Sequence, residues 1–440
     1  MDVLIQIAQL ILSLSILVIF HEFGHFAFAK LFKTKVEKFY LFFDAWFSLF
    51  KFKKGDTEYG IGWIPLGGYV KIAGMIDESM DKEQMKKPPQ PWEFRSKPAW
   101  QRLLIMLGGV MVNFILAGLI YVAILFAWGD DYLPVENAKY GIAGDSVAYE
   151  LGFMDGDKIL KINDNTPDRF TQIIPEIILN TPARVELERN GTIKTVTINE
   201  DHVAKIISTN GKSKLISPRF KFTADTILPK SNAEKAGILK GDQFIGLDSE
   251  ELEFYDQYVK KFTGNPATEF TAKILRNRDT LDIQLETDED GKIGIITISG
   301  NQFTIAHKDY SLAESVPAGL KKGIDQTKNY LKQFKLIFNP ETKAYKSLGS
   351  FITIGNLFPK LWDWHSFWSL TAFLSIILGV VNILPIPALD GGHVMFVLYE
   401  MITGRKPGDK FLEVAQIVGF VLLIGLMIFA LKNDIVNNFF

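Results

Sequence analysis

The stretch HEFGH, His21 to His25, holds the residue types of this 440-residue chain that are best suited to chemistry. On a helix, residues i and i+4 share a face, so His21 and His25 can hold one metal ion. Glu22 then lies beside that ion and can take a proton from a water molecule. The spacing therefore predicts a metal site with a general base next to it.

HExxH is the zinc metalloprotease pattern, and here it directly follows an uncharged apolar run, Val3 to Phe20. As a bare string the pattern also occurs by chance. Ionisable side chains deep in a membrane helix are costly unless they are paired or bind a metal. The location therefore favours a metal site over a chance match.

A catalytic zinc normally has three protein ligands, so His21 and His25 need a third. The chain has no cysteine, which leaves His, Asp or Glu. Asp390 is the preferred candidate, because Pro385 and Pro387 break the helix before it, and broken backbone at membrane depth is tolerated where it lines a cavity.

Two alternatives stay open for this segment. Asp390 could be a span-end residue that meets water, and His393 is a rival for the third ligand. The remaining histidines are expected at the surface: His202, His307 and His365.

Four uncharged apolar runs are long enough to cross a membrane: Val3–Phe20, Leu103–Trp128, Ser366–Leu389 and Val414–Leu431. At 1.5 Å per residue, about 18 residues span a hydrocarbon core of about 30 Å. Buried helices of a soluble protein are one alternative, and a cleaved signal peptide is another for the first run, but that run lacks a positive n-region. The predicted fold class is a multi-pass α-helical membrane protein.

Basic residues near the span ends predict the orientation. The loop between the first two spans is flanked by Lys30, Lys33, Lys35, Lys97 and Arg102, and the last loop contains Arg405, Lys406 and Lys410. The positive-inside rule places both loops in the cytoplasm. Both chain ends and residues 129–365 are then expected outside.

The outside segment contains an internal repeat, LGFMDGDKILKIND from Leu151 and AGILKGDQFIGLDS from Ala236. Its Gly-Asp pair fits a tight turn that leads into a strand. The repeat predicts two small α+β domains, and its pattern resembles that of PDZ domains, which bind extended peptides by strand addition. The alternative is a pair of spacers without a ligand.

HEFGH in the first span, LDGG after a helix with two prolines, and a PDZ-like pair between them resemble the site-2 protease family of intramembrane zinc metalloproteases (peptidase family M50). The resemblance is to its regulator of sigma-E protease type, with four spans and tandem PDZ domains, and covers nearly all of the chain. It implies that His21, His25 and Asp390 bind zinc and that Glu22 is the catalytic base.

The resemblance also implies a set of substrate-binding residues. They are Asn382, Pro385 and Pro387 of the pattern Asn-x-x-Pro-x-x-x-x-Asp-Gly, Asn113 in GGVMVN, and Gly67 and Gly68. Close helix packing is the alternative explanation for GGVMVN, in which Gly109 and Asn113 match the family's positions.

Gly67 and Gly68 belong to YGIGWIPLGGYVKIAGM, Tyr59 to Met75, which resembles the family's membrane-associated β-hairpin that presents substrate as an added strand. Trp63 and Tyr69 could anchor it at the interface. The family often has Gly-Phe-Gly-Pro just upstream, whereas residues 41–50 read LFFDAWFSLF. This departure leaves the shape of the loop and the substrate choice open.

The expected domains follow from these patterns. They are 1–32, a transmembrane helix with HExxH; 33–100, the cytoplasmic or membrane-associated hairpin loop; 101–128, the second span; 129–215 and 216–300, the PDZ-like domains; 301–365, an amphipathic connector; 366–397, the third span; 398–411, a cytoplasmic loop; and 412–432, the fourth span. Within the connector, Leu312–Phe338 could lie on the outer membrane surface or pack on the second PDZ-like domain.

By this resemblance the protein cuts single-pass transmembrane helices, such as anti-sigma factors or remnant signal peptides, in a bacterial inner membrane. The active site is expected in the membrane toward the cytoplasmic side, with the PDZ pair outside as a size filter. Expected partners are these substrates, the lipid bilayer and peptide ligands of the PDZ domains. A net charge of -2 gives no basic field for nucleic acid. One alternative is a non-catalytic PDZ membrane scaffold. Another is a transporter with a metal site, which the four spans support little because they do not form inverted pairs.

Overall fold

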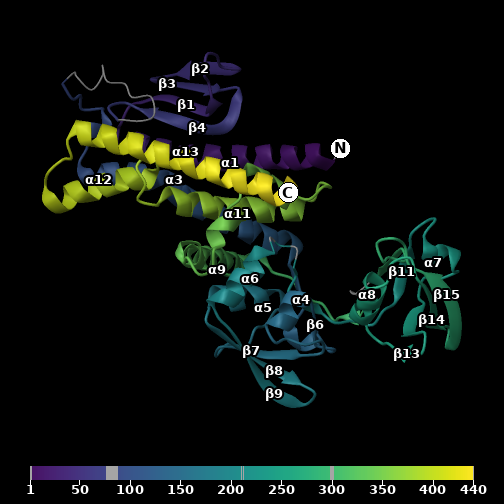
Figure 1. Ribbon diagram of the computed structural model, residues 1–440. Helices are drawn as coiled ribbons and strands as arrows, with labels where there is room; N and C mark the ends of the chain where they lie inside the picture. The colour runs from purple at the N-terminus through teal and green to yellow at the C-terminus, as the bar shows by residue number, and fades with distance from the viewer. Residues whose placement is uncertain (1, 76–87, 210, 212, 298–301, 440) are drawn as a thin grey trace. The chain divides into compact units, whose positions relative to one another are not determined.

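The structure is a computed structural model that describes residues 2–75, 88–209, 211, 213–297 and 302–439. The chain forms two compact units (Figure 1). The helical unit comprises Met1–Gly129, Asp309–Lys335 and Tyr345–Phe440, and the β-rich unit comprises Asp130–Lys308 and Leu336–Ala344.

Within the described residues, four helices of the helical unit are long and apolar enough to cross a membrane. They are α1 (Asp2–Leu31), α3 (Ala99–Trp128), α11 (Trp364–Asn382) and α13 (Asp409–Phe439). The prediction of four membrane spans is confirmed at this level. The chain is therefore an integral membrane protein.

Helices α1 and α3 are in direct backbone contact. A Cβ on Gly24 would lie 2.2 Å from the Gly108 carbonyl oxygen, and a Cβ on Gly108 would lie 2.5 Å from that of Gly24. Side chains of α1, α3 and α11 surround this crossing with an apolar core that includes Leu17, Ile120 and Ile376. The two glycines thus bring α3 close enough for its side chains to reach those of HEFGH.

The expected third span, 366–397, is divided between two helices. Helix α11 ends at Asn382, and after a loop over 383–389 helix α12 (Asp390–Thr403) begins. Ala388 in this loop has a φ of 86°, a strained value for a residue with a side chain. The break occurs where Pro385 and Pro387 predicted it.

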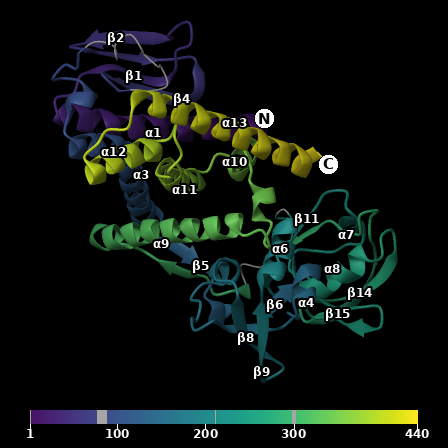
Figure 2. The ribbon, with the colours of Figure 1, turned by 60° about the vertical axis from the view of Figure 1, so that its left-hand side comes forward.

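The connector region forms α9 (Leu312–Phe338) and α10 (Phe351–Leu357). Helix α9 is seen nearly end-on in Figure 1 and lengthwise in Figure 2, so it runs across the direction of α1 and α13. Gly319 and Gly323 face Val122 and Gly118 of α3, and a Cβ on Gly319 would lie 2.5 Å from the Val122 nitrogen. The amphipathic segment therefore packs on a membrane span through its small residues.

A four-stranded sheet follows α1, with strands β1 (Val36–Phe43), β2 (Phe50–Lys54), β3 (Thr57–Ile61) and β4 (Ile64–Ile72) in the order β2-β3-β1-β4. The stretch expected to be a hairpin differs from the prediction. Its two strands, β3 and β4, lie on opposite sides of β1, one parallel and one antiparallel to it. Strand β4 is consequently an edge strand.

The β-rich unit has two lobes, each with its own apolar core. The first lobe, residues 130–218, contains β5 (Asp130–Tyr132), β6 (Ile142–Gly144), α4 (Ser146–Glu150), β7 (Lys158–Ile162), α5 (Ile173–Leu179), β8 (Ala183–Arg189), β9 (Thr192–Ile198), α6 (Glu200–Ser208) and β10 (Ile216–Pro218). The second lobe, residues 219–308, contains β11 (Ala224–Ile227), α7 (Asn232–Lys235), β12 (Gln243–Leu247), β13 (Glu250–Glu251), α8 (Tyr255–Thr263), β14 (Glu269–Arg276), β15 (Asp279–Glu286), β16 (Ile295–Thr297) and β17 (Ala306–Lys308).

The sequence repeat has a structural cause. In each lobe the aspartate of the Gly-Asp pair is buried and accepts two bonds from one arginine, Arg189 to Asp157 and Arg276 to Asp242, at 2.6–2.7 Å. The same arginine also donates to the carbonyl of Gly152 or Gly237 at 2.8 Å. The repeated aspartate thus holds the turn against a neighbouring strand through a bidentate pair.

Candidate active site

His21, His25 and Asp390 converge in the helical unit, although they come from opposite ends of the sequence. The Nε2 atoms of the two histidines lie 3.3 Å apart, and Asp390 Oδ2 lies 3.2 Å from one and 3.3 Å from the other. Ligands about 2.0–2.1 Å from a tetrahedral zinc are about 3.3 Å from one another. The three atoms therefore have the spacing of one face of a zinc coordination tetrahedron.

The protonation of His25 supports a cation at this point. Its Nδ1 lies 2.8 Å from the Ile105 carbonyl oxygen, which can only accept, so Nδ1 carries the proton. Nε2 of the neutral ring then presents a lone pair toward Asp390 Oδ2, which is buried and has no hydrogen-bond donor among the described residues. Lone pairs that face one another in a buried site fit a metal ion between them.

Asn113 on α3 lies behind His21 and is fully buried. Its amide is 3.0 Å from His21 Nδ1, and its Oδ1 has no partner among the described residues. If His21 binds zinc through Nε2, Nδ1 carries a proton, and a half-turn of the amide lets Oδ1 accept it. The structure thus places this predicted substrate-binding residue against a predicted metal ligand.

Gly109 of GGVMVN leaves room for both imidazole rings. A Cβ at this position would lie 2.5 Å from His25 Nε2 and 2.6 Å from His21 Cε1. The Gly-x-x-x-Asn pattern therefore serves two purposes: its glycine admits the rings, and its asparagine contacts one of them.

The loop between α11 and α12 positions Asp390 at the first residue of α12. A Cβ on Gly391 would lie 2.1 Å from the Leu384 carbonyl oxygen, and one on Gly392 would lie 2.6 Å from that of Ile386. The two glycines of LDGG allow the first turn of α12 to fold back tightly onto the loop. This close turn carries Asp390 to the histidines.

Glu22 is half-buried and accepts a hydrogen bond from the backbone N–H of Val70 on β4. Gly68 lies on the same strand, where an added Cβ would be 2.6 Å from Val18 Cγ1 and 3.6 Å from Glu22 Cγ. The edge of β4 therefore runs along the side of α1 that bears the expected base.

The other predicted substrate-binding residues belong to α11, the loop that follows it, and β4. Asn382 is the last residue of α11 and is half-buried, with no hydrogen bond from its side chain among the described residues, while Pro385 and Pro387 lie in the following loop. Gly67 has a φ of 152° on β4. The rival ligand His393 is one turn beyond Asp390 on α12 and is not part of the three-residue cluster.

Polar contacts within the sheet hold β4 in place. The Tyr69 hydroxyl donates to Asp44 Oδ1 at 2.8 Å, and Lys38 lies 3.3 Å from Oδ2 of the same carboxylate. Burial, followed by this hydrogen bond, raises the pKa of Tyr69 well above its ordinary value of 10, so Tyr69 remains a donor. Next to Asp44, the Trp63 indole donates to the Ala45 carbonyl oxygen at 2.6 Å, and its ring stacks with the exposed rings of Trp46 and Phe47.

Two backbone groups at the centre could not be anticipated from residue types. The Ile105 carbonyl orients His25, and the Val70 N–H contacts Glu22. Every residue carries such groups, so only the fold reveals which of them reach the site. The glycines at 24 and 108 are the nearest available signal, because they indicate where the two helices meet.

Comparisons with known proteins agree with this geometry. A family model described as "Peptidase family M50" matches residues 9–426. The chain is 29% identical to a protein of Rickettsia conorii and 28% identical to one of Neisseria meningitidis, both named "Putative zinc metalloprotease"; the alignments cover 99% and 97% of this chain and 100% and 97% of the relatives. It is 26% identical to the regulator of sigma E protease of Haemophilus influenzae over 99% of both chains.

Proposed function

The chain belongs to peptidase family M50 and is a zinc metalloprotease of the site-2 type, and we propose that it cuts single-pass transmembrane helices within the membrane. The observation that carries the proposal is the convergence of His21 Nε2, His25 Nε2 and Asp390 Oδ2 at 3.2–3.3 Å beside a membrane span. These three residues would hold the zinc ion. When bound there, zinc supplies a Lewis acid that polarises the scissile carbonyl and acidifies water.

Glu22 is proposed as the general base. Its carboxylate takes a proton from the attacking water and later gives it to the nitrogen of the leaving amine. The Val70 N–H holds the carboxylate next to the edge of β4, so the base and the expected path of the substrate backbone are adjacent.

Strand β4 is proposed to bind the substrate as an added strand. A transmembrane helix satisfies its own amides, so the segment to be cut must unwind and needs new hydrogen-bond partners. The edge of β4, which contacts Glu22 through the Val70 N–H, and the Asn382 amide at the end of α11 are proposed to provide such partners. Pro385 and Pro387 keep the loop over 383–389 irregular. Gly68 lets β4 lie close to Val18 of α1, and Gly67 keeps the neighbouring backbone free of a side chain.

The two lobes of the β-rich unit are proposed to be PDZ-like domains that lie outside the bacterial inner membrane and act as a size filter. The repeated Gly-Asp turns support their common origin. A substrate whose outer domain has been removed is then expected to be cut at least about tenfold faster than the same substrate with a folded outer domain. Equal rates in reconstituted membranes would rule out the filter.

The test of the proposal combines metal content with cleavage. We expect about one zinc per chain in the detergent-purified full-length protein and a loss of zinc in His21→Ala and Asp390→Ala. Glu22→Gln should retain zinc but cut a panel of single-pass helices about 10²–10⁴-fold more slowly. Cleavage by Glu22→Gln at the wild-type rate would show that Glu22 is not the general base. A folded wild-type protein that contains no zinc would show that the proposed metal centre does not bind zinc.

A further inference from the structure

A cavity of about 140 Å³ lies in the helical unit, lined by residues of α12 and of the start of α13. Figure 1 shows where these two helices meet. The beginning of α3 also borders the cavity. Its apolar wall includes Phe94, Phe396, Val397 and Leu412, and its polar side includes Arg95, Arg102, Glu400 and Lys406. No step of the proposed cleavage uses this cavity.

The charges around the cavity do not cancel. Arg102 Nη2 lies 2.5 Å from Glu400 Oε1, and Arg95 Nε lies 2.6 Å from Glu93 Oε2, so both arginines are paired. Lys406 donates to the Arg95 carbonyl oxygen at 3.0 Å, and within the described residues no carboxylate pairs with it. Among the residues that the structure describes, Lys406 is thus a positive charge without a carboxylate partner next to an apolar wall.

We propose that this cavity binds one anionic phospholipid, with the phosphate at Lys406 and the first part of an acyl chain along Phe396 and Leu412. A free phosphate ion would pair with Lys406 but would make no favourable contact with the aromatic and aliphatic wall. The cavity also lies at the ends of membrane helices, which is the level of lipid headgroups. A basic pocket between membrane helices is the setting in which such headgroups are bound.

The orientation of the chain strengthens this assignment. In the proposed topology this end faces the cytoplasm, where the anionic leaflet attracts lysine and arginine near the ends of spans. Lys97 and Lys410 belong to the same basic end of the helical unit. The pocket is thus expected to meet anionic lipid at high local concentration.

Helix α12 connects the cavity to the metal centre. His393, Val397 and Glu400 line the cavity from one face of this helix, and Asp390 is its first residue. A bound lipid therefore contacts the same helix that presents a metal ligand. This connection rests on the proposed function, whereas the lipid binding itself does not.

The experiment is native mass spectrometry of the full-length, delipidated protein with added phosphatidylglycerol or phosphatidylcholine of identical acyl chains. We expect one phosphatidylglycerol to bind preferentially, and Lys406→Gln to bind it about five-fold more weakly. The control is Lys432→Gln, which removes an exposed lysine near the other end of α13. Leu412→Gln, which keeps the charge but makes the wall polar, should also weaken binding by several fold.

Three results would overturn the proposal. Equal affinity for the two lipids would remove the requirement for an anionic headgroup, and unchanged binding in Lys406→Gln or Leu412→Gln would place the lipid elsewhere. Competition by inorganic phosphate at millimolar concentration would show a free-phosphate site. Zinc content, measured on the same samples, reports separately on the metal centre, so failure of one proposal does not imply failure of the other.

Discussion

Asn113 is a buried side chain on one helix that contacts a proposed metal ligand on another. Its amide faces His21 Nδ1, and partners of this kind typically contribute 10–100-fold to metal affinity. We expect Asn113→Leu to weaken zinc binding by about that factor, measured by competition with a chelator. Asn113→Asp keeps the acceptor and should restore most of the affinity. Equal affinity in the leucine variant and the wild type would show that the contact has no such role.

The glycine at 109 provides a second test at this scale. Because a Cβ there would overlap both imidazole rings, Gly109→Ala should displace them and reduce zinc affinity by at least about tenfold. The matched control is Gly425→Ala, since nothing lies within 4 Å of a Cβ at that position of α13. Zinc content by elemental analysis compares the two, and similar values would contradict a steric role for Gly109.

At the scale of elements, the sequence predicted local features well and long-range pairing poorly. The break at Pro385 and Pro387 is a local backbone effect, and it occurs where expected. The alternation in Tyr59–Met75 fits either a hairpin or two strands that flank a third. The two arrangements differ in whether β1, Val36–Phe43, lies between the two strands. Nothing within Tyr59–Met75 indicates that β1 is the partner of both.

Asp434 provides a prediction about how the outer elements are held together. This buried carboxylate, close to the end of α13, accepts hydrogen bonds from the backbone and hydroxyl groups of both Ser350 and Thr353, at the start of α10. Hydrogen bonds to a charged group contribute about 1.5–3 kcal/mol, so Asp434→Ala should lower the thermal midpoint by several degrees. Asn433→Ala, one residue away, removes weaker contacts at 3.2–3.3 Å and should have a smaller effect. Equal midpoints for the two variants would contradict this role for Asp434.

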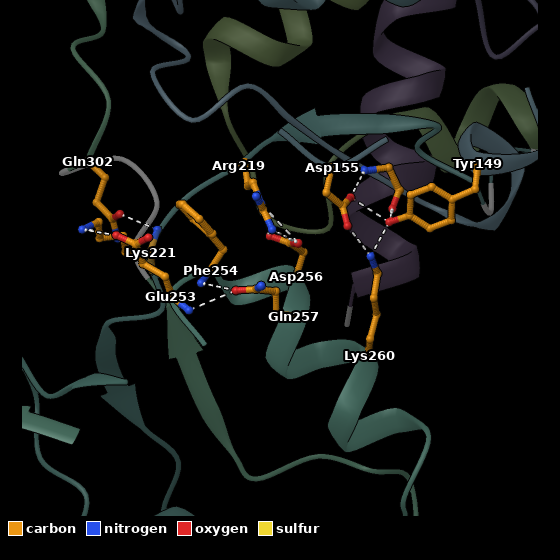
Figure 3. A network of polar contacts seen from close by, with 11 residues as sticks. Tyr149, Asp155, Arg219, Lys221, Glu253, Phe254, Asp256, Gln257, Lys260 and Gln302 are labelled. Atoms are coloured by element: carbon orange, nitrogen blue, oxygen red, sulfur yellow. Dashed lines mark hydrogen bonds and ion pairs between the residues drawn. The ribbon is translucent and has the colours of Figure 1, made fainter. Parts of the chain in front are cut away.

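At the scale of the whole molecule, the two lobes of the β-rich unit are joined by a polar seam (Figure 3). Lys260 of the second lobe lies 2.5 Å from Asp155 of the first and also contacts Tyr149. Close by, the rings of Tyr140 and Phe254 meet across the lobes at 5.2 Å. These contacts hold the two lobes in one mutual orientation.

This seam should respond to acid. Burial alone would raise the pKa of Asp155, but Lys260, the Gly144 N–H and the Tyr149 hydroxyl offset it and lower the pKa below 3.8. Because the folded pKa is lower than the unfolded one, the contact stabilises the pair above about pH 4 and is lost as the pH falls through the folded value. The distance distribution between the lobes should therefore broaden as the pH falls through the folded pKa of Asp155, below 3.8.

Because the chain has no cysteine, spin labels attach only at cysteines that are introduced for the distance measurement. Spin labels at Lys194→Cys and Glu289→Cys, one on each lobe, report the distance between them. Asp155→Asn should broaden the distribution already at pH 7, whereas the control Asp290→Asn, within one lobe, should not. A narrow distribution in Asp155→Asn would show that other contacts, such as the pairing of β5 with β17, fix the lobes without this carboxylate.

The position of the metal ligands along the chain has a consequence for biosynthesis. His21, Glu22 and His25 are made at the start of translation, whereas Asp390 follows only after three of the four spans and both lobes. If the proposed roles hold, a nascent chain has the base and two ligands in the membrane but cannot complete the zinc site. We therefore expect the protease to stay inert toward helices inserted beside it until nearly all of its own chain has left the ribosome.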